Sequence, residues 1–246
     1  MTLQFLNCFT CNARIPSSWR TGTVCILADT EQGLVLIDTG PGVTDYRHPP
    51  AILRIFQVIT KVRVNSDETA FHQVKRLGYK PEDVRHIILT HMHFDHCGGI
   101  GDFPWATIHI HRGEYEAFMD RPRQFTDLAY VRRHVAHRPR IALYHHDGES
   151  WNGLPAIALP FQPEIWLVPL PGHSRGQCGV ALRNGVGWHF HVADAGPVAL
   201  KDYAPAWLVN FVLGRQTDRL RAFAAAHPEV DITTGHMWLS FFKPNI

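Results

Sequence analysis

Four side chains that commonly bind metal ions, His91, His93, Asp95 and His96, lie within six residues of one another, between the apolar segment His86–Thr90 and a Gly-Gly pair. Zinc prefers imidazole nitrogen and carboxylate oxygen as ligands. Alternate side chains of an extended segment point to the same side, so His91 and His93 can reach one ion. Asp95 and His96 lie on the continuing turn and can face a second ion. This spacing predicts a metal site rather than a solvated histidine loop.

Three further candidate ligands each follow a predicted strand. His173 lies in a Pro-Gly-His-Ser sequence, Asp194 follows the apolar run 188–193, and His236 follows residues 232–235. Loops at strand ends commonly carry binding residues. Each of the three alone could be an ordinary turn residue, but together with the first run they predict a site with ligands for two metal ions.

The elements that must position these residues are strands that come in pairs early and alternate with helices later. Val24–Ala28 and Leu34–Ile37 predict a hairpin. A helix is predicted over Ser66–Leu77, with Ser66 as its N-cap and Gly78 as its stop. Further strands are predicted at His86–Thr90, Ala106–Ile110, Trp166–Val168, Val180–Leu182, Trp188–Ala193 and Asp231–Thr234, and a second helix is predicted to be capped by Thr217 and ended by Pro228. From Gly113 to about Pro160 the pattern is helical and irregular. We expect two sheets flanked by helices in a single α/β domain over residues 1–246.

Composition narrows the functional classes. Of the 246 residues, 45% are apolar and 19% are charged, which predicts a packed core rather than disorder. A net charge of +2 is too small to indicate nucleic-acid binding by itself, so we expect no nucleic-acid partner. Five cysteines without a framework spacing argue against a disulfide-stapled secreted domain, and Cys8 and Cys11 are interpreted as small buried thiols. With no signal peptide and no apolar run long enough to span a bilayer, a cytoplasmic location is predicted.

In their order along the chain, these motifs resemble those of the metallo-β-lactamase superfamily, from about residue 20 to the end. The resemblance implies an αββα sandwich with metal ions at one edge of the paired sheets. It implies that one metal is held by His91, His93 and His173, that the other is held by Asp95, His96 and His236, and that Asp194 bridges them. Asp38, in an Asp-Thr-Gly strand exit, matches a family position that supports the ligand loop by hydrogen bonding.

The implied cofactors are two divalent metal ions, with zinc favoured and iron or manganese also suited to such nitrogen and oxygen ligands. Two cations lower the pKa of a bridging water, so that hydroxide is available near neutral pH to attack a carbonyl or phosphoryl group. Asp95 is then the natural proton carrier to the leaving group, and Asp95 and Asp194 are the predicted catalytic residues. Cys97, beside His96, is interpreted as a packing thiol rather than a nucleophile.

Three branches of the superfamily remain open as functional hypotheses. The lactonase branch, which hydrolyses N-acyl homoserine lactones, is favoured and predicts cleavage of a lactone or other carboxylic ester. Those lactonases carry a tyrosine three residues after the bridging aspartate, where this chain has Pro197, and Tyr203 is the nearest later tyrosine. The alternatives are a thioesterase of glyoxalase II type and a persulfide dioxygenase that uses a single iron. A metal-binding scaffold without activity is the non-enzymatic alternative, disfavoured by the complete ligand set.

The best indication of the substrate is the stretch 113–160, called here the substrate-side segment. Between Arg121 and His146 it holds six arginines and four histidines, with Asp127 the one acidic residue. This composition fits either a solvated surface or a rim that attracts an anionic small molecule. Aromatic residues in the same stretch, among them Phe125 and Tyr130, could line a pocket for an acyl chain. The oligomeric state is not indicated by the sequence.

Overall fold

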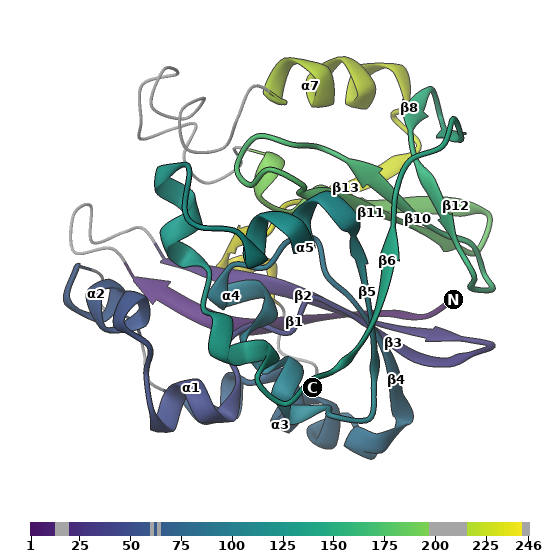
Figure 1. Ribbon diagram of the computed structural model, residues 1–246. Helices are drawn as coiled ribbons and strands as arrows, with labels where there is room; N and C mark the ends of the chain where they lie inside the picture. Colours follow the sequence, from purple (N-terminus) through teal and green to yellow (C-terminus); the bar gives the residue numbers. More distant parts are fainter. Residues whose placement is uncertain (13–19, 60–61, 63–64, 197–215, 243–246) are drawn as a thin grey trace.

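The computed structural model describes residues 1–12, 20–59, 62, 65–196 and 216–242. Two sheets lie face to face between layers of helices (Figure 1). This arrangement is the αββα sandwich of a single mixed α/β domain, as the sequence predicts.

The larger sheet has seven strands in the order β1-β2-β3-β4-β5-β6, with β14 paired to β2. Its strands are β1 (Leu3–Asn12), β2 (Arg20–Thr30), β3 (Gly33–Ile37), β4 (Val84–Ile88), β5 (Thr107–His111), β6 (Arg140–Tyr144) and β14 (His236–Trp238). The predicted hairpin is confirmed, because β2 and β3 pair antiparallel with Ile26 opposite Ile37. From β3 to β6 the strands run parallel, so their carboxyl ends meet at one edge of the sheet.

The smaller sheet has five strands in the order β13-β12-β11-β10-β9. They are β9 (Ile157–Leu159), β10 (Ile165–Pro169), β11 (Cys178–Asn184), β12 (Gly187–His191) and β13 (Val230–Thr233). β7 (Ser150–Trp151) and β8 (Leu154–Pro155) form a separate hairpin. The strands β9 to β12 pair antiparallel and β13 joins β12 in parallel, which brings the segments before Asp194 and before His236 side by side.

Alternation of side chains along β2 explains the layered core. Val24 and Ile26 face the interior between the sheets, whereas Cys25 and Leu27 face the outer layer that contains α3. A strand buried on both faces reads as a nearly continuous apolar run. A third cluster packs Leu220 of α7 against the outer face of the smaller sheet.

The helices cover the outer faces and one end of the sandwich (Figure 1). They are α1 (Val43–Arg47), α2 (Ala51–Ile59), α3 (Ala70–Arg76), α4 (Phe94–Cys97), α5 (Arg112–Met119) and α7 (Thr217–Ala226). Single 3₁₀ turns lie at η1 (Ser66–Glu68), η2 (Pro81–Asp83), η3 (Gly98–Asp102), η4 (Phe125–Ala129), η5 (Arg132–Val135), η6 (Ala193–Ala195) and η7 (Leu239–Phe241). Within the described ranges no helix is long and apolar enough to cross a membrane.

Both predicted N-caps are wrong. The helix expected over Ser66–Leu77 is divided into η1 and α3, because the extended backbone of Thr69 interrupts it and the Thr69 hydroxyl caps α3 by accepting the His72 N–H at 3.4 Å. Ser66 begins η1, and Asn65 caps that turn. At the second helix, Thr217 is the first residue of α7, and the preceding Gln216 makes no side-chain cap. The stop at Gly78 is confirmed by its φ of +87°, a conformation that glycine adopts without strain.

The substrate-side segment differs from the prediction in its second half. It begins with α5, η4 and η5, but β6 then joins the large sheet in parallel with β5, and β7 to β9 follow. The five residues of β6 include Arg140 at an exposed position, so its apolar run is short. Its strand conformation depends on pairing with β5, a tertiary contact that local sequence does not reveal.

Candidate metal centre

The predicted metal-binding run begins at the carboxyl end of β4. His91 and His93 lie on the extended connection, and α4 carries Asp95 and His96. The Gly-Gly pair allows close packing here, because a Cβ on Gly98 would lie 2.4 Å from Asp45 Oδ2. Gly99 donates its N–H to Gly40 O at 2.8 Å, which ties the run to the loop after β3. The local fold thus turns four candidate ligands toward one edge of the sandwich.

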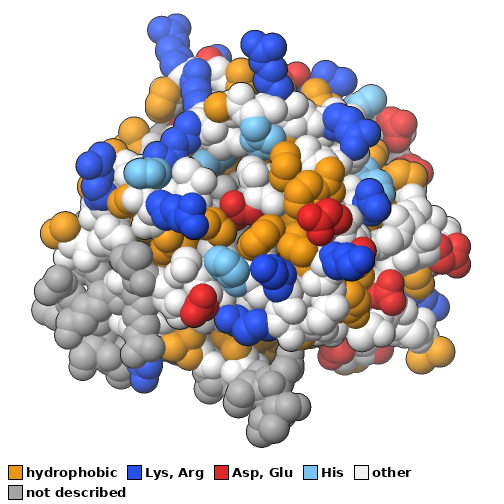
Figure 2. Space-filling model, turned by 90° about the horizontal axis from the view of Figure 1, so that it is seen from below, with side chains coloured by type: hydrophobic (Ala, Val, Ile, Leu, Met, Phe, Trp, Pro, Cys, Tyr) orange, Lys and Arg blue, Asp and Glu red, His pale blue; other side chains and the backbone are white. Residues whose placement is uncertain are grey.

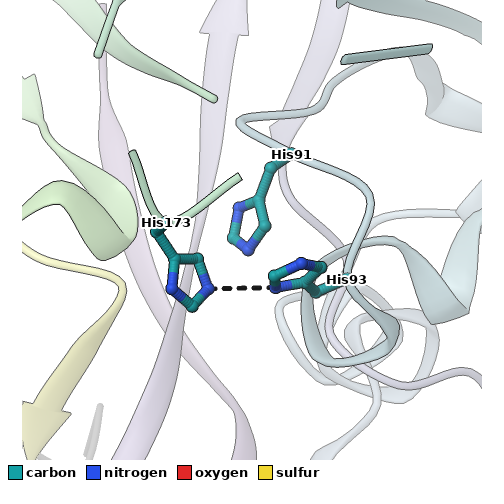
Figure 3. Close-up of side chains that lie close together, drawn as sticks. All are labelled: His91, His93 and His173. Carbon is teal, nitrogen blue, oxygen red and sulfur yellow. Dashed lines mark hydrogen bonds between the residues drawn. The ribbon is translucent and has the colours of Figure 1, made fainter. Parts of the chain in front are cut away.

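The first group contains three imidazoles, those of His91, His93 and His173 (Figure 3). Their ligand atoms lie within 4.8 Å of one another, and all three residues are buried. His173 Nε2 is 2.9 Å from His93 Nδ1. Because His173 follows β10 of the smaller sheet, the group is assembled from both sheets.

The second group contains Asp95, His96 and His236. His236 Nε2 lies 3.5 Å from Asp95 Oδ2, and His96 Nε2 lies 4.0 Å from the same oxygen. His236 begins β14, whose pairing with β2 brings its ring beside α4. The Thr23 hydroxyl lies 3.3 Å from His236 Nδ1 and orients that ring.

Asp194 lies between the two groups. Its Oδ2 is 3.3 Å from His173 Nε2 and 3.4 Å from His236 Nε2, while its Oδ1 is 3.5 Å from His96 Nε2. It is carried by η6, directly after Ala193, whose φ of +47° is unusual for a residue with a Cβ. Gly235 leaves the space this carboxylate needs, since a Cβ there would be 2.0 Å from Asp194 Oδ1.

Unpartnered polar atoms at this site fit the donor set of a metal centre. His91 Nε2, His96 Nε2 and Asp194 Oδ1 are buried without a hydrogen bond in the structure. A buried polar atom left unsatisfied costs about 1–3 kcal/mol. Several such atoms converging from nitrogen and carboxylate ligands are the arrangement that divalent cations of the zinc type satisfy.

Electrostatics acts differently on the two groups of candidate ligands. Burial and neighbouring imidazoles hold the pKa values of His91 and His93 well below the usual histidine range, so these rings are neutral, the form that binds metals. Burial opposes protonation of His96 and His236, but the Asp194 carboxylate raises the pKa values of both, so a metal ion would have to displace their protons. Burial opposes ionisation of Asp194, but His236 and His96 hold its pKa well below the usual range and keep it a carboxylate.

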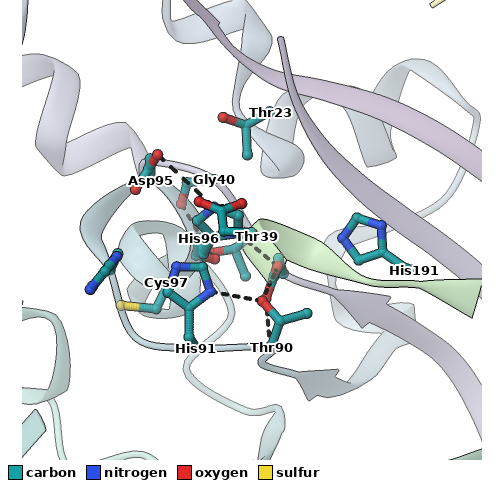
Figure 4. A network of polar contacts seen from close by, with 12 residues as sticks. Thr23, Thr39, Gly40, Thr90, His91, Asp95, His96, Cys97 and His191 are labelled. Atoms are coloured by element: carbon teal, nitrogen blue, oxygen red, sulfur yellow. Dashed lines mark hydrogen bonds and ion pairs between the residues drawn. The ribbon is translucent and has the colours of Figure 1, made fainter. Parts of the chain in front are cut away.

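The side chains of Thr90, His91 and His96 lie in one network of polar contacts (Figure 4). Asp38 supports this network by hydrogen bonding, as the family resemblance implies for its position. It accepts hydrogen bonds from the Thr90 N–H at 2.8 Å and the Thr90 hydroxyl at 2.7 Å, and its Oδ2 lies 2.8 Å from His96 Nδ1. Thr90 Oγ1 is in turn 3.0 Å from His91 Nδ1. Such partners fix the orientation of a ligating imidazole.

Glu114 is the residue at this centre that the sequence did not reveal. It is fully buried and accepts hydrogen bonds from the loops that carry His91, His93 and His173. A glutamate in an amphipathic helix is ordinarily solvated. Since its partners lie 16 to 62 residues away, no local signal distinguished it from Glu116 on the same helix.

The cysteines take no part in the centre. The Cys97 thiol is buried, donates to Met92 O at 3.2 Å, and lies 3.6 Å from His134 Nδ1. Burial raises its pKa well above the usual range, so it is a packing thiol as expected rather than a nucleophile. On β1, Cys8 is buried and Cys11 is half-buried.

Several arginines of the substrate-side segment are engaged in structural contacts. Arg123 pairs with Asp120 at 2.6 Å, Arg133 pairs with the buried Asp45 at 2.6 Å, and Arg140 donates to Trp105 O at 2.8 Å. On the face seen in Figure 2, Lys and Arg side chains are interspersed with acidic and apolar ones. These contacts favour a mainly structural use of the charges over a concentrated anion-binding rim.

The structure does not describe the position that corresponds to the lactonase tyrosine or the nearest later tyrosine. Pro197 and Tyr203 lie outside the described residues. Tyr130 lies beside the centre, with its ring 5.1 Å from that of His93, but its hydroxyl donates to Glu114 Oε1 at 2.9 Å. Tyr130 therefore forms part of the wall of the site, and its hydroxyl hydrogen is already donated to Glu114.

Three histidines outside the candidate ligand set, His109, His189 and His191, contact other side chains. His109 Nε2 lies 2.9 Å from His86 Nδ1, and His109 Nδ1 lies 2.8 Å from the Tyr144 hydroxyl. His189 and His191 both contact the Thr233 hydroxyl, at 2.9 and 3.1 Å. Among the described residues, the candidate metal clusters include none of these histidines.

The sequence is similar to those of a probable metallo-hydrolase and of N-acyl homoserine lactonases. The sequence model of the metallo-beta-lactamase superfamily matches residues 19–196. A probable metallo-hydrolase of Mycobacterium tuberculosis is 40% identical over 198 residues, which are 78% of this chain and 62% of the relative. The N-acyl homoserine lactonase of Bacillus cereus is 32% identical over 155 residues, which are 62% of this chain and 54% of that enzyme. The match thus spans less than two thirds of the length of these curated relatives.

Solved structures agree on the fold. An N-acyl homoserine lactone hydrolase with N-hexanoyl-L-homoserine at its catalytic metal centre has a TM-score of 0.68 and 22% identity, covering 95% of this chain and 92% of that one. The dizinc quorum-quenching lactonase AidC has a TM-score of 0.57 and 20% identity, covering 89% and 73%. At these identities the likeness shows a shared fold.

Proposed function

This chain belongs to the metallo-beta-lactamase superfamily, and we propose that it is a metallo-hydrolase that uses two divalent metal ions, most simply zinc, to cleave a lactone or other carboxylic ester. The observation that carries this proposal is the position of Asp194 between two groups of candidate ligands, within 3.5 Å of a histidine from each. The lactonase relatives favour a lactone over a β-lactam.

In this proposal the first group would hold one ion and the second group the other, and the Asp194 carboxylate, which lies between the groups, would serve as a ligand shared by both. Divalent ions held there would activate water near neutral pH and would polarise the substrate carbonyl. His91 and His93 are neutral and preorganised by burial, so ligand reorganisation is small.

Asp95 is proposed to carry the proton to the leaving oxygen. Its carboxylate lies 3.5 Å from His236, and its side chain is 14% exposed, in contrast to the fully buried His96. A proton carrier must reach both the metal-bound water and the substrate, and partial exposure at the rim fits that role.

The test is a small substrate panel with the metal-loaded protein: a homoserine lactone, a simpler aliphatic lactone and a glutathione thioester. We expect both lactones to be hydrolysed with higher kcat/KM than the thioester. A thioester preference of orders of magnitude would contradict the lactonase proposal and favour the glyoxalase II alternative. Oxidation of a persulfide by a protein with a single iron would favour the dioxygenase.

A further inference from the structure

Glu114 is a fully buried carboxylate on α5 that accepts four hydrogen bonds. Its Oε1 accepts from the Met92 N–H at 2.9 Å and from the Tyr130 hydroxyl at 2.9 Å. Its Oε2 accepts from the Ser174 hydroxyl at 2.7 Å and from the Gly176 N–H at 3.0 Å. Within the described part of the chain no salt bridge to this carboxylate is found, so these donors alone stabilise its charge.

Three of the four donors come from the loops that build the first group. Met92 separates His91 from His93 after β4, whereas Ser174 directly follows His173 after β10. One carboxylate thus ties a loop of the large sheet to a loop of the small sheet, at the point where the three imidazoles meet. The contact is close, since a Cβ on Gly176 would lie 2.1 Å from Glu114 N.

Tyr130 extends the same connection to the substrate-side segment. Its hydroxyl is bound to Glu114, and its ring packs against His93 at 5.1 Å and against Phe118 at 5.5 Å. Glu114 therefore fixes one side of the His93 ring as well as the two backbone loops. Partners of this kind commonly change metal affinity by about 10- to 100-fold.

We propose that Glu114 is a positioning residue that sets the separation between His173 and the His91/His93 pair, and with it the affinity of the first group for its metal ion. The inference rests on the proposed two-metal function. It assigns to Glu114 a supporting role like that of Asp38, whose carboxylate contacts Thr90 and His96.

The variant Glu114→Gln tests the proposal. The amide has one acceptor oxygen in place of two, and its NH₂ group must face either the Met92 N–H or the Gly176 N–H, neither of which can reverse. The matched control is Glu116→Gln, an exposed position on the same helix. Zinc affinity is measured by competition with a chromophoric chelator, and site geometry by the visible spectrum of the cobalt-substituted protein.

We expect one of two zinc equivalents to bind about 10- to 100-fold more weakly in Glu114→Gln, with an altered cobalt spectrum, and no change in Glu116→Gln. A Glu114→Gln protein with a lowered Tm but wild-type affinity for both ions would mean that Glu114 only stabilises the fold. If that variant fails to fold, Ser174→Ala removes a single donor; an unchanged affinity there would also contradict the proposal. A wild-type chain that binds fewer than two ions would instead contradict the two-metal function.

Discussion

The edge of the sandwich that carries the candidate metal ligands, called here the metal edge, differs from the substrate-side segment in the contacts that hold its residues in place. At the edge, the candidate ligands are held by buried hydrogen bonds to Asp38 and Glu114 from loops that directly follow strands. The segment is held in large part by ion pairs of partly exposed arginines, such as Arg133 with Asp45 and Arg175 with Asp127. Buried networks fix positions closely. In these ion pairs the carboxylates are buried, but the arginine ends are partly exposed and screened by solvent, so they tolerate change more readily. This contrast predicts that substitutions at the edge abolish chemistry and that substitutions in the segment adjust substrate binding.

Asp194→Ala is expected to have the largest effect. Loss of the carboxylate between the two groups should lower kcat/KM by more than about 100-fold and release bound metal, because second-sphere losses alone reach that range. Metal content after gel filtration and lactone hydrolysis are the measurements. A metal-replete variant with full activity would show that the bridging role is assigned wrongly.

Asp38→Asn probes the support of the second group. The amide can accept from Thr90 but offers His96 Nδ1 a weaker, uncharged partner. We expect kcat to fall by about 10- to 100-fold, together with weaker binding of one ion. Asp29→Asn, exposed on β2, is the control. Equal activity and equal metal binding of the two variants would contradict a supporting role for Asp38.

Arg175→Gln tests the segment side of the comparison. Arg175 contacts Asp127 at 3.2 Å, Asp120 at 3.4 Å and Ala117 O at 3.1 Å, so it ties the loop after His173 to the segment. Its loss should lower the free energy of unfolding by about 1–2 kcal/mol and raise KM, with metal content unchanged. Arg112→Gln, exposed on α5, is the control. Loss of metal in Arg175→Gln would contradict the prediction that the segment affects substrate binding without affecting metal binding.

His109, on β5, provides an effect on stability that depends on pH and leaves the metal centre unchanged. Burial lowers its pKa to about 4, and His86 adds to that shift. In the unfolded chain this histidine has an ordinary pKa near 6.5, so as pH falls the unfolded chain takes up the proton before the folded chain does. The contribution of neutral His109 to stability is therefore complete above about pH 6.5 and is lost as pH falls toward 4. The loss is on the order of 1–3 kcal/mol.

Denaturant unfolding at pH 7 and pH 5 measures this effect. His109→Phe should reduce the difference between the two pH values, and the exposed His145→Gln should leave it unchanged. An undiminished difference in His109→Phe would assign the pH dependence to other groups.

Local spacing and the family resemblance were sufficient to predict which candidate ligands lie close together, whereas their binding of metal stays a prediction. The run from His91 to His96 and the strand-end positions of His173, Asp194 and His236 converge in space because parallel and paired strands bring their ends together. The β2–β3 hairpin also follows from two apolar runs joined by a polar turn.

The remaining features depend on contacts between distant residues. Glu114 has the sequence surroundings of a surface glutamate and is buried only by loops 22 and 60 residues away. β6 has a short apolar run that becomes a strand because β5 offers an edge for pairing. Arg133 meets Asp45 88 residues away, and Asp127 meets Arg175 48 residues away, so these charges appeared free in the sequence.

Metal content of the purified wild-type chain tests the central claim most directly. The protein is expressed in medium supplied with zinc, iron and manganese, freed of loosely bound ions by gel filtration, and measured by elemental analysis alongside Asp194→Ala. We predict two equivalents of divalent metal per wild-type chain and a marked loss in the variant. A single equivalent of iron, with no second metal under any supplementation, would contradict the two-metal hydrolase and support the dioxygenase alternative.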